Sequence, residues 1–278
     1  MKKIISLLFA LMFCVVGGAT MTGCGGSDEN TLYVYTNSGF APFEYIDEAG
    51  NVVGVDIDIV TKLGSELGYK VKVYDVAFGS IFTEVQKNTN TIGVAGITIS
   101  EDRLESGIFS VPYTTSVQYV VVKDGAFTEA DLVDGKLPVS KLANLSNKKI
   151  GVQESTTGMY LVEDEINGTK DETTGEHVTG SLEGSGAQCL SYANAFLAAN
   201  DIGTQLGAVV VDKLPAQKIC EINSSLVCFE LDSEPESYAI YMNKKATDLK
   251  AKIDEVLTKM INDGTIAQYI NKHSGANA

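Results

Sequence analysis

The segment AGITISEDR, residues 95–103, joins the end of an apolar strand to a polar turn and the start of a helix. Ser100 suits the N-cap position, because its side-chain oxygen can accept a hydrogen bond from a free N–H group of the first turn. Arg103 does not suit that turn, since the helix dipole disfavours a cation there. Free N–H groups and a guanidinium at one helix start form a site for an anion, and an arginine can hold a carboxylate through two parallel hydrogen bonds. Taken alone, the segment is equally consistent with a surface ion pair between Arg103 and a neighbouring acid.

The first 23 residues have the pattern of a bacterial lipoprotein signal peptide. Two lysines precede an apolar run, residues 4–16, that is too short to span a bilayer. The motif MTGC at 21–24 resembles a lipobox, with Cys24 as the lipidated first residue of the mature chain. We therefore predict a signal peptide over 1–23, a flexible tether over 24–30, and an extracytoplasmic domain held to the cell membrane by its N-terminal lipid only. If Cys24 were an ordinary cysteine, the protein would be freely secreted.

The chain of 278 residues carries 36 acidic against 21 basic side chains, a net charge of −15. This charge argues against binding to nucleic acid or to an anionic membrane surface. The two histidines, His177 and His273, are far apart, and no cluster of histidine and cysteine has the spacing of metal ligands, so we expect no metal and no other cofactor. Cys189, Cys220 and Cys228 belong to the mature domain. A bridge between the last two is geometrically possible in an exported protein, but the sequence does not establish it.

Short apolar strands alternate with helical patterns along the domain. A βαβαβ rhythm over 32–95 predicts a parallel sheet, and a similar rhythm restarts at residue 149. The stretch 167–186 is polar and rich in turn residues, so we expect a surface excursion there. Residues 237–242 predict one further strand, and two amphipathic helices close the chain. The pattern predicts an α/β fold of two lobes joined by a two-strand hinge. The predicted boundaries are 31–112 and 238–278 for lobe 1, 118–233 for lobe 2, and 113–117 and 234–237 for the hinge strands.

Three polar groups fall at the carboxyl ends of predicted strands, where open parallel sheets bind their ligands. Gly96, Thr98 and Arg103 form the first group. The second is QESTTG at 153–158, which opens another helix, and the third is Asp212. Taken singly, the second group is typical of a plain N-cap, and Asp212 fits the N-cap of the next helix equally well. Together they predict a site for a zwitterion, an α-amino acid, in which Arg103 and the helix starts hold the α-carboxylate and Asp212 holds the α-ammonium.

These residues belong to a series of motifs that resembles the family-3 extracellular solute-binding proteins, the amino-acid receptors of ABC importers. The resemblance covers residues 32–272. Seven segments carry it in the family's order: NSGFAPFEY (37–45), VGVDIDI (53–59), AGITISEDR (95–103), FSVPY (109–113), IGVQESTTG (150–158), GAVVVD (207–212) and SYAI (237–240). It implies a periplasmic-binding-protein-like fold with the ligand in the cleft between the lobes. It also implies a monomeric receptor whose closure signals a membrane permease.

The resemblance implies a role for individual positions. In the family, the residue matching Arg103 holds the α-carboxylate, and those matching Gly96 and Thr98 hold the ligand from the same lobe, largely through backbone and hydroxyl. The residues matching Thr156 and Thr157 hold the carboxylate from the other lobe, and the one matching Asp212 holds the ammonium. Phe40 and Phe78 fall where the family places aromatic walls, although by themselves both are typical of a core. Asn37 falls where several relatives carry an acid that reads the ligand side chain, which weakens the case for a basic amino acid. We therefore expect an uncharged polar amino acid, because Asn37 and Gln153 can both donate and accept hydrogen bonds. Asp56 is interpreted as a helix-start acid outside the site.

Three other functions compete with a receptor. Some proteins of this fold dehydrate arogenate or prephenate, a reaction that needs a positioned acid in the cleft. Glu44 or Glu154 could be proposed for that acid, but the sequence identifies no partner for either, so we expect no enzyme. A sensory module outside a membrane-bound kinase or channel would need a transmembrane helix or signalling domain that the chain does not show after its last helices. A tethered interaction protein without a ligand leaves Arg103 at its helix start unexplained.

Overall fold

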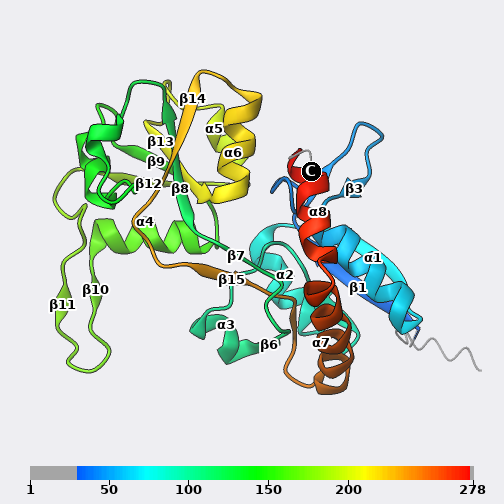
Figure 1. Cartoon of the computed structure of the whole chain (residues 1–278). Helices are drawn as coiled ribbons and strands as arrows, with labels where there is room; N and C mark the ends of the chain where they lie inside the picture. Colours follow the sequence, from blue (N-terminus) through cyan, green and yellow to red (C-terminus); the bar gives the residue numbers. More distant parts are fainter. Residues whose placement is uncertain (1–29, 276–278) are drawn as a thin grey trace, which may run out of the picture.

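The computed structural model describes residues 30–275, which form two α/β lobes (Figure 1). The predicted signal peptide and the lipidation site at Cys24 lie outside the described residues. Each lobe is built on a five-stranded sheet. In lobe 1 the strand order is β4 (Lys70–Asp75), β1 (Thr31–Thr36), β5 (Thr91–Gly93), β16 (Tyr241–Asn243) and β6 (Gly107–Phe109). In lobe 2 it is β12 (Gln188–Tyr192), β9 (Lys149–Gln153), β13 (Ala208–Asp212), β8 (Gln118–Lys123) and β14 (Leu226–Glu230).

The two sheets share one layout. In lobe 1, β1 pairs in parallel with β4 and β5, and in lobe 2, β9 pairs in parallel with β12 and β13. The next strand in each sheet, β16 or β8, runs antiparallel to its neighbours. The predicted parallel arrangement is therefore confirmed for three strands of each sheet, and the antiparallel strand is the one that enters each lobe from the hinge.

The hinge consists of β7 (Thr114–Ser116) and β15 (Glu236–Tyr238), which pair antiparallel and run between the lobes (Figure 1). The prediction of one continuous strand over 237–242 is wrong, because the chain forms β15 and β16 there and changes partners between them. The N–H of Ala239 donates to the carbonyl of Ile97, and the N–H of Ser110 donates to the carbonyl of Ile240. These bonds fix the short segment that connects β15 of the hinge to β16 of the lobe 1 sheet.

Helices cover the sheets of both lobes (Figure 1). Lobe 1 contains α1 (Val55–Leu67), α2 (Phe78–Val85), α3 (Glu101–Ser106), α7 (Thr247–Asn262) and α8 (Thr265–Ser274), with the short strands β2 (Tyr45–Ile46) and β3 (Val52–Val53). Lobe 2 contains α4 (Thr157–Asn167), α5 (Ala195–Ala199), α6 (Lys213–Ile222) and two 3-10 turns, Glu129–Asp131 and Val139–Asn144. The predicted surface excursion is an exposed hairpin of β10 (Thr169–Lys170) and β11 (His177–Val178).

Helix α1 shows how local sequence sets the position of the loop that precedes it. Its apolar stripe, which includes Ile59 and Leu63, is fully buried, and the helix ends where Gly68 takes a left-handed φ of 76°. Just before the helix, Gly54 has a φ of 136°, and a Cβ there would lie 2.1 Å from the carbonyl oxygen of Phe43. Only a glycine allows this approach, which presses the chain around Phe43 against the start of α1.

The apolar core continues through both lobes. Alternate residues of β8 face opposite sides, with Val121 in the largest cluster and Val120 and Val122 in a second one. The largest cluster also joins lobe 1 residues such as Phe40 to Ile219 of α6 in lobe 2. The lobes are therefore in apolar contact, as in a closed state. Across residues 30–275, no helix combines the length and the apolar character needed to cross a membrane.

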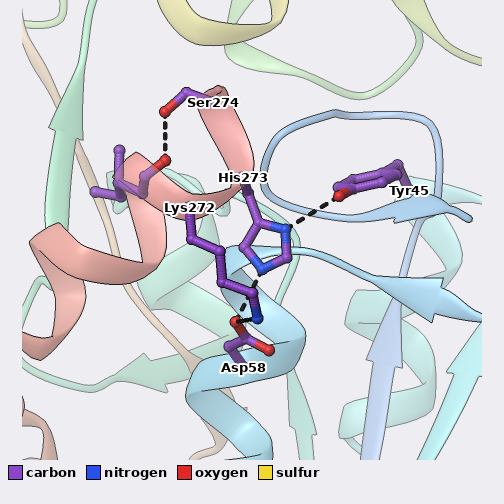
Figure 2. Close-up of polar contacts among 6 residues, drawn as sticks. Tyr45, Asp58, Lys272, His273 and Ser274 are labelled. Carbon is purple, nitrogen blue, oxygen red and sulfur yellow. Dashed lines mark hydrogen bonds and ion pairs between the residues drawn. The ribbon is translucent and has the colours of Figure 1, made fainter. Parts of the chain in front are cut away.

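The end of α8 is tied to lobe 1 by a polar cluster around His273 (Figure 2). Nδ1 of His273 lies 3.1 Å from the Tyr45 hydroxyl, and Nε2 lies 2.8 Å from Oδ2 of Asp58 in α1. The same oxygen of Asp58 is 2.7 Å from the ammonium of Lys272. The side chain of His273 is only 7% exposed, whereas that of Lys272 is 61% exposed. The last turn of α8 therefore buries His273 between α1 and β2.

Cys189, Cys220 and Cys228 carry free thiols in this structure. Helix α6, which holds Cys220, packs against β14, which holds Cys228. The bridge that the sequence left open is not formed here. Among the described residues, no group of three histidine, cysteine or acidic side chains could hold a metal ion.

Candidate ligand-binding site

Arg103, the only arginine of the chain, is buried at the interface between the lobes. The predicted N-cap is confirmed, since Ser100 accepts a bond from the N–H of Arg103 at the start of α3. Nη1 of Arg103 donates to the carbonyl of Thr98 at 2.7 Å, and Nη2 donates across the interface to the carbonyl of Ser155 at 3.2 Å. These two bonds hold the guanidinium in one place without giving it a negative partner.

The alternative of a surface ion pair is wrong. Arg103 is 8% exposed, and no ion pair among the described residues includes it. Its guanidinium carbon lies 4.9 Å from the ring centroid of Phe82 and 5.4 Å from that of Phe78. Burial lowers the pKa of Arg103, and the charges of Glu236 and Asp212 partly oppose that effect. A buried cation without a bonded carboxylate is costly unless an anion joins it.

The first turn of α4 faces Arg103 from lobe 2. Thr156 is its N-cap, because its hydroxyl accepts a bond from the N–H of Met159. Thr157, the first helical residue, donates its hydroxyl to Oε2 of Glu236 at 2.7 Å. Ser155 takes a left-handed φ of 63°, and its carbonyl accepts the bond from Arg103. The N-cap interpretation of this segment is correct, and the same turn also lies beside the cavity.

Asp212 ends β13 and is 7% exposed. It stands at the N-cap position of α6, as the alternative interpretation predicted, but its side chain accepts no capping bond. Its Oδ1 has no hydrogen-bond partner. Burial is the main cause that raises the pKa of Asp212 to about 7, and the charge of Glu236 adds to it. Polar groups of Tyr238, Ser116 and Gln118 act in the opposite direction.

All the predicted ligand-binding residues except Asn37 line one cavity between the lobes. Its walls are Phe40, Glu44, Phe78, Ala95, Gly96, Thr98, Arg103, Gln153, Thr156, Thr157 and Asp212. Only about 10 Å³ of it is open to the centre of a water molecule, which is roughly the room that one water needs. An amino acid therefore enters only when the lobes move apart. The site is formed in its closed state, with opposite charges at Arg103 and Asp212.

Asn37 lies outside the cavity walls and bonds across the interface instead. Its Oδ1 accepts a bond from Nε2 of Gln153 at 2.9 Å, and its Nδ2 donates to the carbonyl of Val76 at 2.6 Å. Oε1 of Gln153 is buried without a partner. In this closed state Gln153 therefore offers the cavity an acceptor, while the amide oxygen of Asn37 and one of its donors are already used.

Glu44 lines the same cavity, although nothing in its local sequence places it there. It is 1% exposed, and its Oε2 has no hydrogen-bond partner. Burial raises the pKa of Glu44 well above its ordinary value, and the nearby carboxylate of Asp56 raises it further. A buried carboxyl oxygen without a partner is an atom that a ligand can satisfy.

Asp56 lies in the first turn of α1 and outside the cavity walls, as predicted, but it is fully buried and acts on the site indirectly. It accepts bonds of 2.8 Å from the N–H of Gly96 and from the hydroxyl of Tyr113. Burial raises its pKa to about 6, and both of these bonds oppose the shift. Gly96 has a φ of 53°, and a Cβ there would meet the ring of Phe40 at 2.7 Å. Asp56 thus anchors the glycine turn that carries Thr98 and Arg103 to the cavity.

Glu236 bonds to residues of the site, and the sequence did not predict it. It lies on β15 of the hinge and accepts bonds from Thr98 at 2.5 Å, from Thr157 at 2.7 Å and from Nε2 of Gln118 at 2.8 Å. The only sequence signal is its position directly before the motif SYAI. That position predicts a place in the hinge and no role toward a ligand.

This fold and this site agree with the comparisons to known proteins. The sequence profile described as bacterial extracellular solute-binding proteins, family 3, matches residues 32–276. The chain therefore belongs to that family.

Two relatives illustrate the likeness. A protein of Neisseria gonorrhoeae named as a probable histidine-binding protein is 29% identical over 153 residues, which cover 51% of this chain and 53% of that protein. The match thus spans about half the length of that relative. The crystal structure of a mutant of the T. maritima protein ArgBP is 26% identical with a TM-score of 0.72, over 88% of this chain and 95% of that one.

An ancestral arginine-binding protein has been solved with two ligands. The structure bound to glutamine is 28% identical with a TM-score of 0.71, over 88% of this chain and 97% of that one. The structure bound to arginine is also 28% identical, with a TM-score of 0.72, over 88% and 98%.

Proposed function

We propose that this protein binds one α-amino acid between its lobes and delivers it to the permease of an ABC importer. The observation that carries the proposal is the pair Arg103 and Asp212. Both are buried at one cavity, and neither has a bonded partner of opposite charge. A zwitterion supplies both missing charges at once, with its carboxylate at Arg103 and its ammonium at Asp212.

Closure then follows from the distribution of these groups between the lobes. Arg103 belongs to lobe 1, and Asp212 and the first turn of α4 belong to lobe 2. A ligand that contacts both lobes binds the closed state better than the open one and shifts the population toward it. The closed state is what the permease would recognise.

The free groups on the cavity wall favour a ligand side chain with hydrogen-bond donors. Oε1 of Gln153 and Oε2 of Glu44 are both buried without partners. Burial raises the pKa of Glu44 and so disfavours its ionised form while no cation is present. An uncharged amide side chain, such as that of glutamine, has two N–H donors and can donate to Gln153 and to Glu44.

A cationic side chain is the second candidate, and Glu44 is the observation that favours it. A guanidinium or ammonium next to this carboxyl would stabilise its ionised form and lower its pKa. Phe40 and Phe78 stand in the same cavity wall, and aromatic rings attract cations. The named ligands of several relatives, arginine and histidine, are consistent with this alternative.

The dehydratase alternative gains a candidate acid in Glu44, whose pKa is raised in the cavity. Incubation of the purified protein with arogenate or prephenate tests it directly. Turnover would replace the receptor proposal with an enzyme, whereas unchanged substrate together with tight binding of an amino acid would support a receptor.

A thermal-shift screen of the mature chain against the common amino acids tests the proposed function. A ligand at a hundred times its dissociation constant adds roughly 2.7 kcal/mol to the free energy of unfolding. For a domain of this size that is a rise in Tm of roughly 5–10 °C. Comparison of glutamine with arginine separates the two candidates, and a screen in which no amino acid raises the Tm would overturn the proposal.

The membrane anchor is also a proposal, supported by the MTGC motif at 21–24. Lipidation of Cys24 would keep a monomeric receptor within reach of the permease. Replacement Cys24→Ser should release the protein from the membrane fraction without changing its affinity for the ligand.

A further inference from the structure

Glu236 connects the hinge to both sides of the binding cavity. It lies on β15, whereas Thr98 comes from the turn before α3 in lobe 1, and Thr157 begins α4 in lobe 2. Both threonine hydroxyls donate to the same oxygen, Oε2, at 2.5 and 2.7 Å, and Oε1 accepts from Gln118. One hinge carboxylate therefore bonds to one residue of lobe 1 and two of lobe 2.

The direction of these bonds decides what the two hydroxyls can offer a ligand. A hydroxyl has one proton to donate and two lone pairs that accept, and an ionised carboxylate only accepts. The protons of Thr98 and Thr157 are therefore both directed at Glu236. Thr98 and Thr157 also line the ligand cavity, so there their hydroxyls present acceptors only.

We propose that Glu236 is a positioning residue that directs the hydroxyl protons of Thr98 and Thr157 away from the cavity and so makes the site select a ligand with an α-ammonium. This inference rests on the proposed function and deepens it. Two hydroxyl acceptors in the cavity that Asp212 also lines suit an ammonium, which has three donors. They do not suit the ligand's carboxylate, which leaves that group to Arg103 and to backbone N–H groups. The family resemblance assigned Thr157 to the carboxylate, and this arrangement leaves its hydroxyl unable to donate to it.

The charge of Glu236 also changes the pKa of Arg103 and of Asp212, the two charged groups proposed to bind the ligand. It adds to the burial that raises the pKa of Asp212, and it opposes the burial that lowers the pKa of Arg103. Tyr238 and Ser116 of the hinge, Gln118 of β8 and Arg103 of α3 are the other groups that act electrostatically on Asp212. Removal of the charge should therefore lower the pKa of Asp212.

The test compares Glu236→Gln with the matched control Glu234→Gln, an exposed acid two residues away in the same connection. Because Gln118 donates to Oε1 and both threonines donate to Oε2, a glutamine at 236 that keeps the bond from Gln118 places its NH2 group at the Oε2 position. There it donates to the threonine hydroxyls, whose protons then turn toward the cavity. The amino acid found in the screen and its analogue without the α-amino group are titrated calorimetrically into each variant. We expect Glu236→Gln to reduce the affinity ratio of amino acid to analogue roughly tenfold. Glu234→Gln should keep the ratio of the wild-type protein.

The pH profile provides a readout that loss of structure alone would not shift. Asp212 must be ionised to hold an ammonium, so affinity should fall as the pH drops below about 7 in the wild-type protein. In Glu236→Gln this midpoint should move to lower pH. If Glu236→Gln does not fold, Thr98→Val removes one positioned hydroxyl and should lower the affinity ratio in the same way.

The outcomes separate the inference from the proposed function. An unchanged affinity ratio, or an equal loss of affinity for both ligands with an unshifted pH midpoint, would overturn the role of Glu236 while the receptor function stands. A wild-type protein that binds no amino acid would overturn the proposed function, and the inference with it.

Discussion

Gln153 and Asn37 join the two lobes through one hydrogen bond, from Nε2 of Gln153 to Oδ1 of Asn37 at 2.9 Å. Gln153 lines the ligand cavity and Asn37 does not. The family resemblance assigns Asn37 to recognition of the ligand side chain. In this closed state Asn37 instead forms a hydrogen bond that holds the lobes together.

Replacement Asn37→Ala should favour the open state without changing ligand preference. A neutral hydrogen bond contributes about 1 kcal/mol, so the ratio of closed to open protein should fall roughly fivefold without ligand. Small-angle scattering or a distance label in each lobe would detect the larger separation. Affinities for glutamine and arginine should weaken by the same factor, and a change in their ratio would restore Asn37 as a residue that reads the side chain.

Arg103 offers a chemical test because the chain has no other arginine. A reagent specific for guanidinium groups, such as phenylglyoxal, should modify the protein at this residue alone. Modification should be slow in the closed state, where Arg103 is 8% exposed, and slower still with bound ligand. Mass spectrometry measures the rate.

Two variants complete the test of Arg103. Arg103→Ala should abolish the thermal shift by the ligand without unfolding the protein. Arg103→Lys keeps the positive charge but loses the two parallel N–H donors of the guanidinium, so it should bind the ligand with reduced affinity. Full binding by Arg103→Ala would exclude a contact with the ligand's carboxylate.

Asp212 should make the empty protein less stable as the pH rises. Its pKa is raised from 3.8 to about 7 on folding, so the folded state holds the proton more tightly than the unfolded state. Stability from this group is complete below about pH 4 and is lost as the pH rises to about 7. Asp212→Asn cannot ionise, so it should match the wild-type protein near pH 4. At pH 8 it should be more stable, by a difference on the order of 2–4 kcal/mol.

Urea unfolding at pH 4, 6 and 8 measures this effect without ligand. The exposed acid Asp232 provides a matched control, since Asp232→Asn should show no such dependence. Asp212→Asn should also fail to bind the amino acid. A variant that is less stable than wild type at pH 8 would mean that the carboxylate is needed by the empty fold.

His273 should contribute to stability and not to binding. His273→Ala removes two partly buried hydrogen bonds, to Tyr45 and to Asp58, and should cost about 1–3 kcal/mol. Lys272→Ala removes only an exposed partner of the same Asp58 and should cost less than about 1 kcal/mol. Hydrogen exchange in α8 should accelerate in the first variant and stay unchanged in the second. Equal effects of the two variants would contradict the role of burial.

Much of the fold and part of the site are predictable because their signals are local. The strand and helix periodicities, the N-cap at Ser100 and the cation at Arg103 each depend on residues within a few positions of one another. Strand ends in a parallel sheet meet at one edge, and this rule groups Thr156 with Asp212 in lobe 2 and places Arg103 at the corresponding edge of the lobe 1 sheet. The error over residues 237–242 has the opposite cause, since an apolar run does not reveal that its two halves pair with different sheets.

The sequence alone therefore determined the class of protein and the charged ends of the site. Only the tertiary structure decided which polar groups are left free for a ligand. The bond from Thr98 to Glu236 spans 138 residues, and that from Gln153 to Asn37 spans 116. Whether a hydroxyl or an amide faces the cavity as a donor or as an acceptor depends on the partner it meets across such a distance, and no local pattern contains that partner.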